Sequence, residues 1–212
     1  MLVKDFELIV FDWDGTLMDS TARIVSAMQT TARNLHLEVP SEQDVKNIIG
    51  LSLSECYYRL FPKVDDHAWI TEEYRYQYVT GDKTPSPLFE GVGDTLSLLK
   101  REGHKLAVAT GKARHGLDRV LHESGLEDFF DLTIASDESK SKPDPHMLNS
   151  VLDRLSIKAK DAVMVGDTTY DLEMAVNAKM SAIGVSFGAH RVDQLKKYSP
   201  YAIIDDIRKL KE

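Results

Sequence analysis

Two aspartates separated by a single residue follow the first apolar segment of the chain. The segment Leu8–Phe11 leads directly into Asp12, Trp13, Asp14 and Gly15. A carboxylate at the end of a buried segment loses its hydration, which is costly unless a cation or a reaction makes use of the charge. The glycine permits a tight turn that would free both carboxylates. Taken alone, the pattern fits a divalent cation or a catalytic role and a plain acidic turn about equally well.

Three later apolar segments end in residues of complementary chemistry. Thr110 and Gly111 offer a hydroxyl and an accessible backbone N–H, which suit a phosphate oxygen, although by themselves they are better explained as an ordinary strand end. Lys142 stands just before a helix start that otherwise has a complete structural explanation. Asp167 and Asp171 place two more acids after a strand, about one helical turn apart. Asp171 alone could simply stabilise a helix N-terminus, whereas Asp167 has no such explanation.

All four segments are expected at the same edge of one sheet, where open α/β sheets bind their ligands. Together they supply carboxylates, one hydroxyl and one ammonium group. Phosphoryl transfer needs such a set, because it uses a nucleophile, acids that bind magnesium and donors that hold the phosphate. The combination therefore predicts an enzyme that transfers phosphoryl groups.

Short continuous apolar runs must position these residues. Such runs are typical of parallel strands that are covered on both faces, and helical periodicity fills the gaps between them. Alternating strands and helices from about residue 88 predict a doubly wound, Rossmann-like α/β core with a parallel sheet. The expected strands are residues 8–11, 106–109, 132–135, 162–165 and 182–185.

A helical segment interrupts this alternation after the first strand. Ser41 and Ser52 each precede an acidic residue by three positions, which is the capping-box pattern that starts a helix. No convincing strand intervenes in this part of the sequence. We therefore expect an inserted α-helical cap domain at residues 16–87, and a discontinuous core formed by residues 1–15 and 88–212.

Composition excludes several classes of partner. The chain has 26 basic and 34 acidic residues, a net charge of −8, which disfavours nucleic acids because they are bound mainly through clustered Lys and Arg. No apolar run approaches the roughly 18 residues of a membrane-spanning helix, and the first residues lack a signal-peptide pattern. A single cysteine, Cys56, fits a reducing compartment. We expect a cytoplasmic monomer or homodimer without a nucleic acid or membrane partner.

On these residues the chain resembles the haloacid dehalogenase-like hydrolase superfamily, and within it the phosphoglycolate phosphatase-like members with a helical cap. Residues 12–17 are similar to the first motif of that family, Thr110 to the second, Lys142 to the third, and residues 166–171 to the fourth. The resemblance covers nearly the whole chain. One departure is Gly111, where relatives often carry Asn or Ser.

The resemblance implies a role for each residue of the reaction. Asp12 is the expected nucleophile, which forms an aspartyl-phosphate, and Asp14 is the expected general acid and base. Thr110 and the Gly111 N–H would hold the phosphate. Lys142 would offset negative charge on the nucleophile and on the phosphoryl group, because two anions otherwise repel each other.

The resemblance also implies a Mg²⁺ site. Asp12 and Asp167 are the expected direct ligands, and Asp14 would contribute its main-chain carbonyl. Asp171 is expected to steady the water shell of the ion. Oxygen ligands together with retained waters are what magnesium prefers in proteins.

The expected function is hydrolysis of a small phosphorylated metabolite, which could be phosphoglycolate, pyrophosphate or a sugar phosphate. A phosphosugar mutase is the alternative enzyme, although residues 19–23 lack the histidine that such mutases usually carry. Asp14 counts against a dehalogenase, and a non-catalytic binding protein is the remaining alternative. Residues 50–52, between two expected helices of the insertion, are predicted to face the site and to influence substrate choice.

Overall fold

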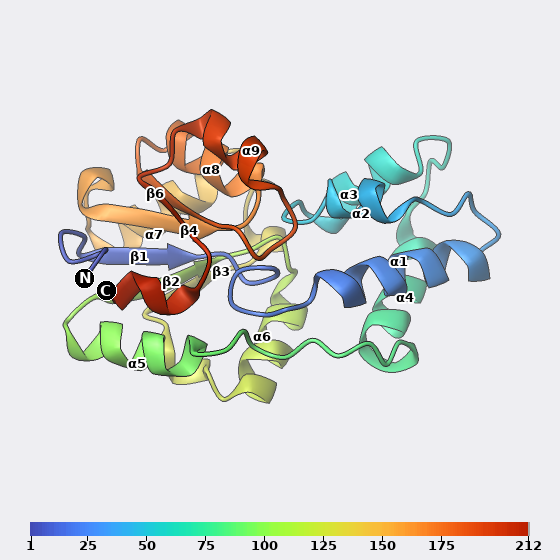
Figure 1. The fold of residues 1–212 in the computed structure, drawn as a ribbon. Coiled ribbons are helices and arrows are strands. Elements are labelled where there is room, and N and C mark those ends of the chain that lie inside the picture. The colour runs from blue at the N-terminus through green and yellow to red at the C-terminus, as the bar shows by residue number, and fades with distance from the viewer. Residues whose placement is uncertain (212) are drawn as a thin grey trace.

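The computed structural model describes residues 1–211, which fold around a six-stranded parallel sheet (Figure 1). The strand order is β3-β2-β1-β4-β5-β6, so the first strand lies near the middle of the sheet. This arrangement confirms the predicted doubly wound α/β core. The strands are β1 Leu8–Phe11, β2 Lys105–Ala109, β3 Leu132–Ile134, β4 Ala162–Gly166, β5 Ser181–Val185 and β6 Ala202–Ile204.

Helices cover both faces of the sheet because the strands present apolar side chains on both faces. Along β1, Ile9 and Phe11 join one buried cluster, whereas Leu8 and Val10 join the other. The first cluster packs against α5 and α6, and the second against α7, α8 and α9. These helices are α5 Val92–Arg101, α6 Arg114–Ser124, α7 His146–Leu155, α8 Thr169–Asn177 and α9 Val192–Leu195.

The strand order places a crevice at the carboxyl end of β1. The chain leaves β1 toward β2 on one side of the sheet, and it leaves β4 toward β5 on the other side. Neighbouring strands whose connections diverge in this way leave an opening between them, where open α/β proteins bind ligands. The loops that follow β1 and β4 therefore border the expected site.

Four helices between β1 and β2 stand beyond the carboxyl ends of the strands (Figure 1). They enclose an apolar cluster of their own, which includes Met28, Val45, Tyr57 and Ile70. We call this segment, residues 16–87, the helical insertion. Its helices are α1 Thr21–Asn34, α2 Glu42–Lys46, α3 Leu53–Leu60 and α4 Ala68–Tyr76, and α4 continues into a π-helical turn at Gln77–Gly81.

The two predicted capping boxes of the insertion differ in outcome. Ser41 and Asp44 form the reciprocal pair at the start of α2. Ser52 precedes α3 as expected, but its side chain makes no capping hydrogen bond, so this prediction is wrong. The Ser52 hydroxyl instead lies 3.2 Å from the Ser54 hydroxyl. Its backbone N–H donates to the Ser141 hydroxyl of the core, at 3.0 Å.

The two chain segments that join the insertion to the core run side by side. Asp19 N–H donates to the Pro87 carbonyl at 2.8 Å, and Phe89 N–H donates to the Leu17 carbonyl at 2.9 Å. An isolated antiparallel bridge between Met18 and Leu88 lies between these bonds. The two segments that connect the insertion to the core are therefore hydrogen-bonded to each other.

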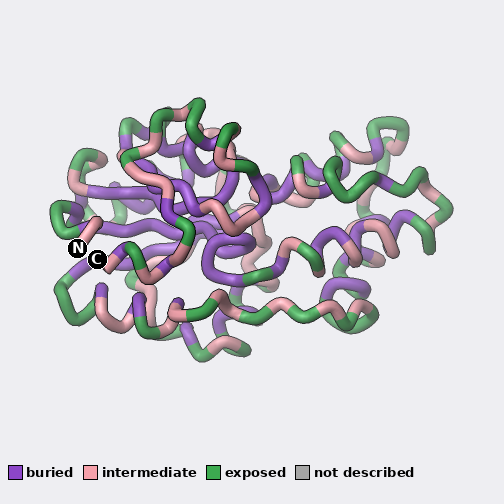
Figure 2. The backbone as a smooth tube through the Cα atoms, in the orientation of Figure 1, coloured by how far each residue is buried: buried purple, intermediate pink, exposed green. Residues whose placement is uncertain are grey.

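Burial follows the layered arrangement (Figure 2), with the strands buried and the outer faces of the helices exposed. Strand β6, which forms one edge of the sheet, was not predicted from the sequence. Within residues 1–211, the structure has no helix that is both long and apolar enough to cross a membrane.

Candidate active site

Three buried carboxylates meet at the crevice between β1 and β4. Asp12 follows β1, Asp167 follows β4, and Asp171 lies in the first turn of α8. One oxygen from each of the three lies within 4.8 Å of the others, and none of the three residues is more than 1% exposed. We call these residues the aspartate triad. The sequence predicted that all three would come together at this edge.

The side chain of Lys142 lies against the triad. Its Nζ is 2.9 Å from Asp12 Oδ1 and 2.6 Å from Asp171 Oδ1. Burial lowers the pKa of the Lys142 ammonium, but the two carboxylates outweigh this effect and raise that pKa above its usual value. The lysine therefore stays charged although it is fully buried, as its predicted role requires.

The triad carries more negative charge than Lys142 can balance. Burial raises the pKa of Asp12 to about 7, against the opposing effect of Lys142. Burial and the charges of Asp171 and Asp12 hold the pKa of Asp167 well above its usual value. Oδ2 of Asp12 has no hydrogen bond partner among the described residues although it is buried. Hard oxygen donors with unbalanced negative charge fit a divalent cation such as Mg²⁺.

Glycines allow the backbone to approach the triad closely. Gly15 has a φ of +78°, and a Cβ at this position would collide with the Asp167 carboxylate. The same carboxylate accepts hydrogen bonds from Thr16 Oγ1 at 2.9 Å and from Ala189 N–H at 2.8 Å. Only glycine meets both the turn and the close approach at position 15, which explains its place between the two acids and the insertion.

Asp14 lies beside the triad but belongs to a different set of contacts. Its carboxylate accepts a hydrogen bond from Ser20 Oγ at 2.7 Å, and Lys112 Nζ lies 2.9 Å from Oδ1 and 2.8 Å from Oδ2. The Asp14 side chain is thus not one of the clustered metal-ligand groups. A contact between Asp14 and a metal would have to use the main-chain carbonyl, as the resemblance implies.

Lys112 is the main site residue that sequence reasoning missed. It follows Thr110 by two positions at the end of β2, so its place near the site was the one signal that could have found it. Burial lowers the pKa of its ammonium, but Asp14 and Tyr78 more than offset this and raise it. Its Nζ also lies over the Tyr78 ring, 4.7 Å from the centroid.

The insertion closes over Thr110 and Gly111. Thr110 is buried at the end of β2, and its hydroxyl accepts a hydrogen bond from the Lys112 N–H. A Cβ on Gly111 would lie 2.5 Å from the Leu51 carbonyl oxygen and 2.7 Å from that of Gly50. The backbone of the insertion therefore leaves no room for a side chain at position 111.

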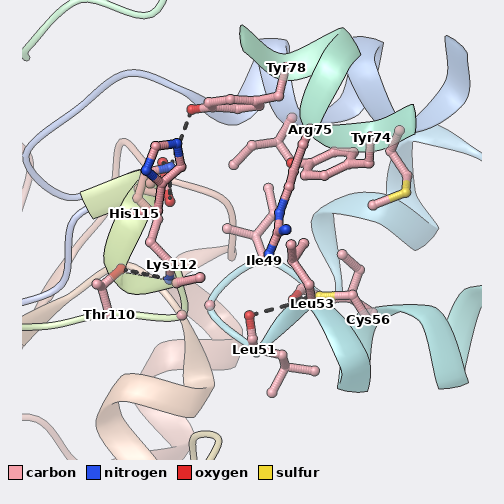
Figure 3. A pocket seen from close by; sticks show the side chains of 18 of the residues that line it. Ile49, Leu51, Leu53, Cys56, Tyr74, Arg75, Tyr78, Thr110, Lys112 and His115 are labelled. Carbon is pink, nitrogen blue, oxygen red and sulfur yellow. Dashed lines mark hydrogen bonds and ion pairs between the residues drawn. The ribbon is translucent and has the colours of Figure 1, made fainter. Parts of the chain in front are cut away.

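A cavity of about 190 Å³ opens between the insertion and the core (Figure 3). It reaches Asp12, Asp14 and Thr110 on the core side, and Gly50 and Leu51 on the insertion side. The structure thus brings Gly50 and Leu51 to the site as predicted, whereas Ser52, the third residue of that prediction, is not among the residues that line the cavity. Two tyrosines of the insertion that were interpreted as packing residues, Tyr74 and Tyr78, are buried and also line the cavity.

Cys56 also lines this cavity, but its thiol is not prepared for chemistry. Burial raises the pKa of the Cys56 thiol to about 12. A thiol in this form is a poor nucleophile at neutral pH. The prediction that Cys56 is a buried structural residue is consistent with its surroundings.

The chain is similar to several known proteins. The family model for haloacid dehalogenase-like hydrolases matches residues 9–185. The probable phosphatase IndB of Dickeya dadantii is 38% identical over 93% of this chain and 89% of its own length. The pyrophosphatase PpaX of Bacillus cereus is 30% identical over 95% of this chain and 93% of its own. A predicted phosphoglycolate phosphatase from Haemophilus somnus shares the fold, with a TM-score of 0.88 and 24% identity over 98% of this chain and 97% of that structure.

Proposed function

Because the chain belongs to the haloacid dehalogenase-like hydrolase family, we propose that it is a Mg²⁺-dependent phosphatase that forms an aspartyl-phosphate on Asp12. Its curated relatives are named as phosphatases, and the chain is a phosphoric ester hydrolase of the same kind. The substrate would be a small phosphorylated metabolite. We further propose that residues 16–87 act as a cap domain over a core of residues 1–15 and 88–212.

One observation carries this proposal more than any other. The Asp12 carboxylate is buried among Lys142 and two further aspartates, yet its Oδ2 has no hydrogen bond partner among the described residues. A buried polar atom without a partner is rare in native proteins unless the site has a use for it. An oxygen kept free in this way is available to attack phosphorus.

In the first step, one Asp12 oxygen attacks the phosphorus atom, and the bond between phosphorus and the ester oxygen breaks. Asp14 gives a proton to the leaving oxygen, so the alcohol departs as a neutral molecule. Asp12 then carries the phosphoryl group as a mixed anhydride. Thr110 and the Gly111 N–H would bind the phosphoryl oxygens, since both lie at the same end of β2 and line the cavity.

In the second step, Asp14 accepts a proton from a water molecule while the water oxygen attacks phosphorus. The bond between Asp12 and phosphorus breaks, which restores the Asp12 carboxylate and releases inorganic phosphate. After the first step the Asp14 carboxylate has lost its proton, so it can accept this one. Its contacts with Lys112 and Ser20 fix the direction in which the carboxylate points.

The aspartate triad is the proposed magnesium site, with Asp12 and Asp167 as direct ligands. Asp171 would contact the water shell of the ion rather than the ion itself, because its Oδ1 pairs with Lys142 and its Oδ2 accepts hydrogen bonds from Thr168. When bound, Mg²⁺ would reduce the repulsion between the phosphate and the Asp12 carboxylate. Lys142 serves the same purpose from within the chain.

Release of inorganic phosphate from p-nitrophenyl phosphate tests the proposed function. We expect turnover with Mg²⁺, loss of turnover with excess chelator, and recovery when Mg²⁺ is restored. A folded preparation that releases no phosphate from this ester or from acetyl phosphate under any metal condition would contradict the proposal. A mutase would instead return the phosphoryl group to a sugar phosphate rather than release it.

A further inference from the structure

The cavity has a polar end and an apolar end. Its polar end is the proposed reaction site, with Asp12 and Thr110. Its other end lies within the insertion and is walled by aliphatic and aromatic side chains, several of which Figure 3 labels. The main groups of this apolar end are Ile24, Met28, Ile49, Leu53 and Tyr74. A leaving group attached to a phosphate at Asp12 would project among these side chains.

The positive side chains around the apolar end are mostly engaged. Lys112 pairs with Asp14, and Arg119 pairs with Glu123 at 2.7 Å. Arg75 has no ion pair among the described residues, but it is an exposed residue at the cavity wall. A second anionic group placed among Ile49 and its neighbours would lose water and could pair only with Arg75 or His115, both of which are exposed residues of the cavity lining. Such a transfer is unfavourable.

We propose that the substrate is a phosphomonoester whose leaving group is uncharged, largely apolar and about the size of one ring. This inference rests on the proposed function, since it concerns the same site. It separates the candidate substrates, because pyrophosphate and phosphoglycolate each bring a further negative charge into the apolar end. An apolar ring would instead exchange water for contact with these side chains.

The volume of the cavity sets the size of the leaving group. An engineered apolar cavity of about 150 Å³ accepts benzene, and the cavity here measures about 190 Å³. Part of that volume takes the phosphoryl group at Asp12. The remainder suits a ring of about five or six atoms.

The experiment compares kcat/KM of the wild-type protein for phenyl phosphate, pyrophosphate and phosphoglycolate, with Mg²⁺ present. Acetyl phosphate serves as the reference, because its small leaving group makes few contacts with the insertion. We expect phenyl phosphate to exceed both anionic substrates by about tenfold or more. A higher kcat/KM for pyrophosphate or phosphoglycolate would overturn the inference.

A matched pair of variants tests whether the apolar end is responsible. Leu53 and Leu60 are both half-buried leucines of α3, but only Leu53 lines the cavity. We expect Leu53→Asn to lower the ratio of kcat/KM for phenyl phosphate over acetyl phosphate by about tenfold. Leu60→Asn should leave this ratio unchanged, because its cost falls on the packing of the insertion alone.

The outcomes separate failure of this inference from failure of the proposed function. If acetyl phosphate is hydrolysed but phenyl phosphate is not favoured, the function stands and the inferred substrate class is wrong. Equal changes of the ratio in Leu53→Asn and Leu60→Asn would also refute it, since the effect would then be structural. If no ester is hydrolysed, the proposed function itself fails.

Discussion

Replacing Gly111 with alanine tests how closely the insertion must fit against the core. The substitution keeps the backbone N–H that is proposed to bind phosphate, and it adds a single methyl group. That group would lie 2.5 Å from the Leu51 carbonyl oxygen and 2.7 Å from the Gly50 carbonyl oxygen. Both obstacles are backbone atoms, so neither can move without shifting the segment between α2 and α3.

The size of the effect follows from these distances. Ordinary contact begins at about 3.4 Å, so the Leu51 carbonyl must retreat by about 0.9 Å, the difference between 3.4 and 2.5 Å. A misplacement of about 1 Å at a catalytic site can cost roughly a hundredfold in rate. We therefore expect Gly111→Ala to lower kcat/KM for phenyl phosphate by about tenfold to a hundredfold. This corresponds to roughly 1.4–2.7 kcal/mol of barrier.

Steady-state kinetics together with thermal unfolding measure this effect. Gly93→Ala is the matched control, because a Cβ at Gly93 in α5 meets no atom within 4 Å. The control should keep wild-type kcat/KM and should not lose stability, since alanine favours a helix over glycine. Wild-type kcat/KM in a folded Gly111→Ala protein would refute the reasoning, because the insertion would then not rest against position 111 during turnover.

Four further substitutions separate the proposed roles. Asp12→Asn should lower kcat by at least about a thousandfold while thermal unfolding stays near wild type, because an amide cannot act as the nucleophile; retention of a few per cent of wild-type kcat would contradict this. Asp167→Ala should raise the Mg²⁺ concentration for half-maximal activity by at least about tenfold, whereas Asp14→Asn should lower kcat without this shift; the same magnesium dependence in both would oppose the assignment. Lys112→Met should lower kcat by roughly tenfold to a hundredfold through misdirection of Asp14, which is less than Asp14→Asn itself; an additive loss in the double variant would show that the two act independently.

The sheet could be predicted from the sequence because five of its strands are continuous apolar runs. Strand β6, Ala202–Ile204, was not predicted, although β3, Leu132–Ile134, is equally short, forms the other edge of the sheet and was predicted. A run of three residues carries too few side chains to show a period, so the sequence pattern alone does not decide whether it is a strand. Its pairing with β5 is fixed by the tertiary fold, which one sequence does not display.

The site residues that follow strands could also be predicted, because parallel strands bring their carboxyl ends to one edge. The contacts among them could not. Lys112 reaches Asp14 only because β2 and β1 are neighbours in the sheet. In the sequence, Gly111 only indicated the loss of a side-chain donor. The structure adds that the carbonyl oxygens of Gly50 and Leu51 lie where a side chain at position 111 would begin. Ser52 had the right spacing for a capping box, yet its side chain makes no capping hydrogen bond and its N–H donates to the Ser141 hydroxyl of the core.

The central claim is that Asp12 becomes phosphorylated during turnover. Rapid acid quenching of a reaction with phenyl phosphate, followed by borohydride reduction and peptide mass spectrometry, reads out this position directly. The account predicts a peptide in which the Asp12 side chain has been reduced to the alcohol, absent from unreacted protein and from Asp12→Asn. Turnover by wild type with no modification at Asp12 in either wild type or Asp14→Asn would contradict the covalent mechanism.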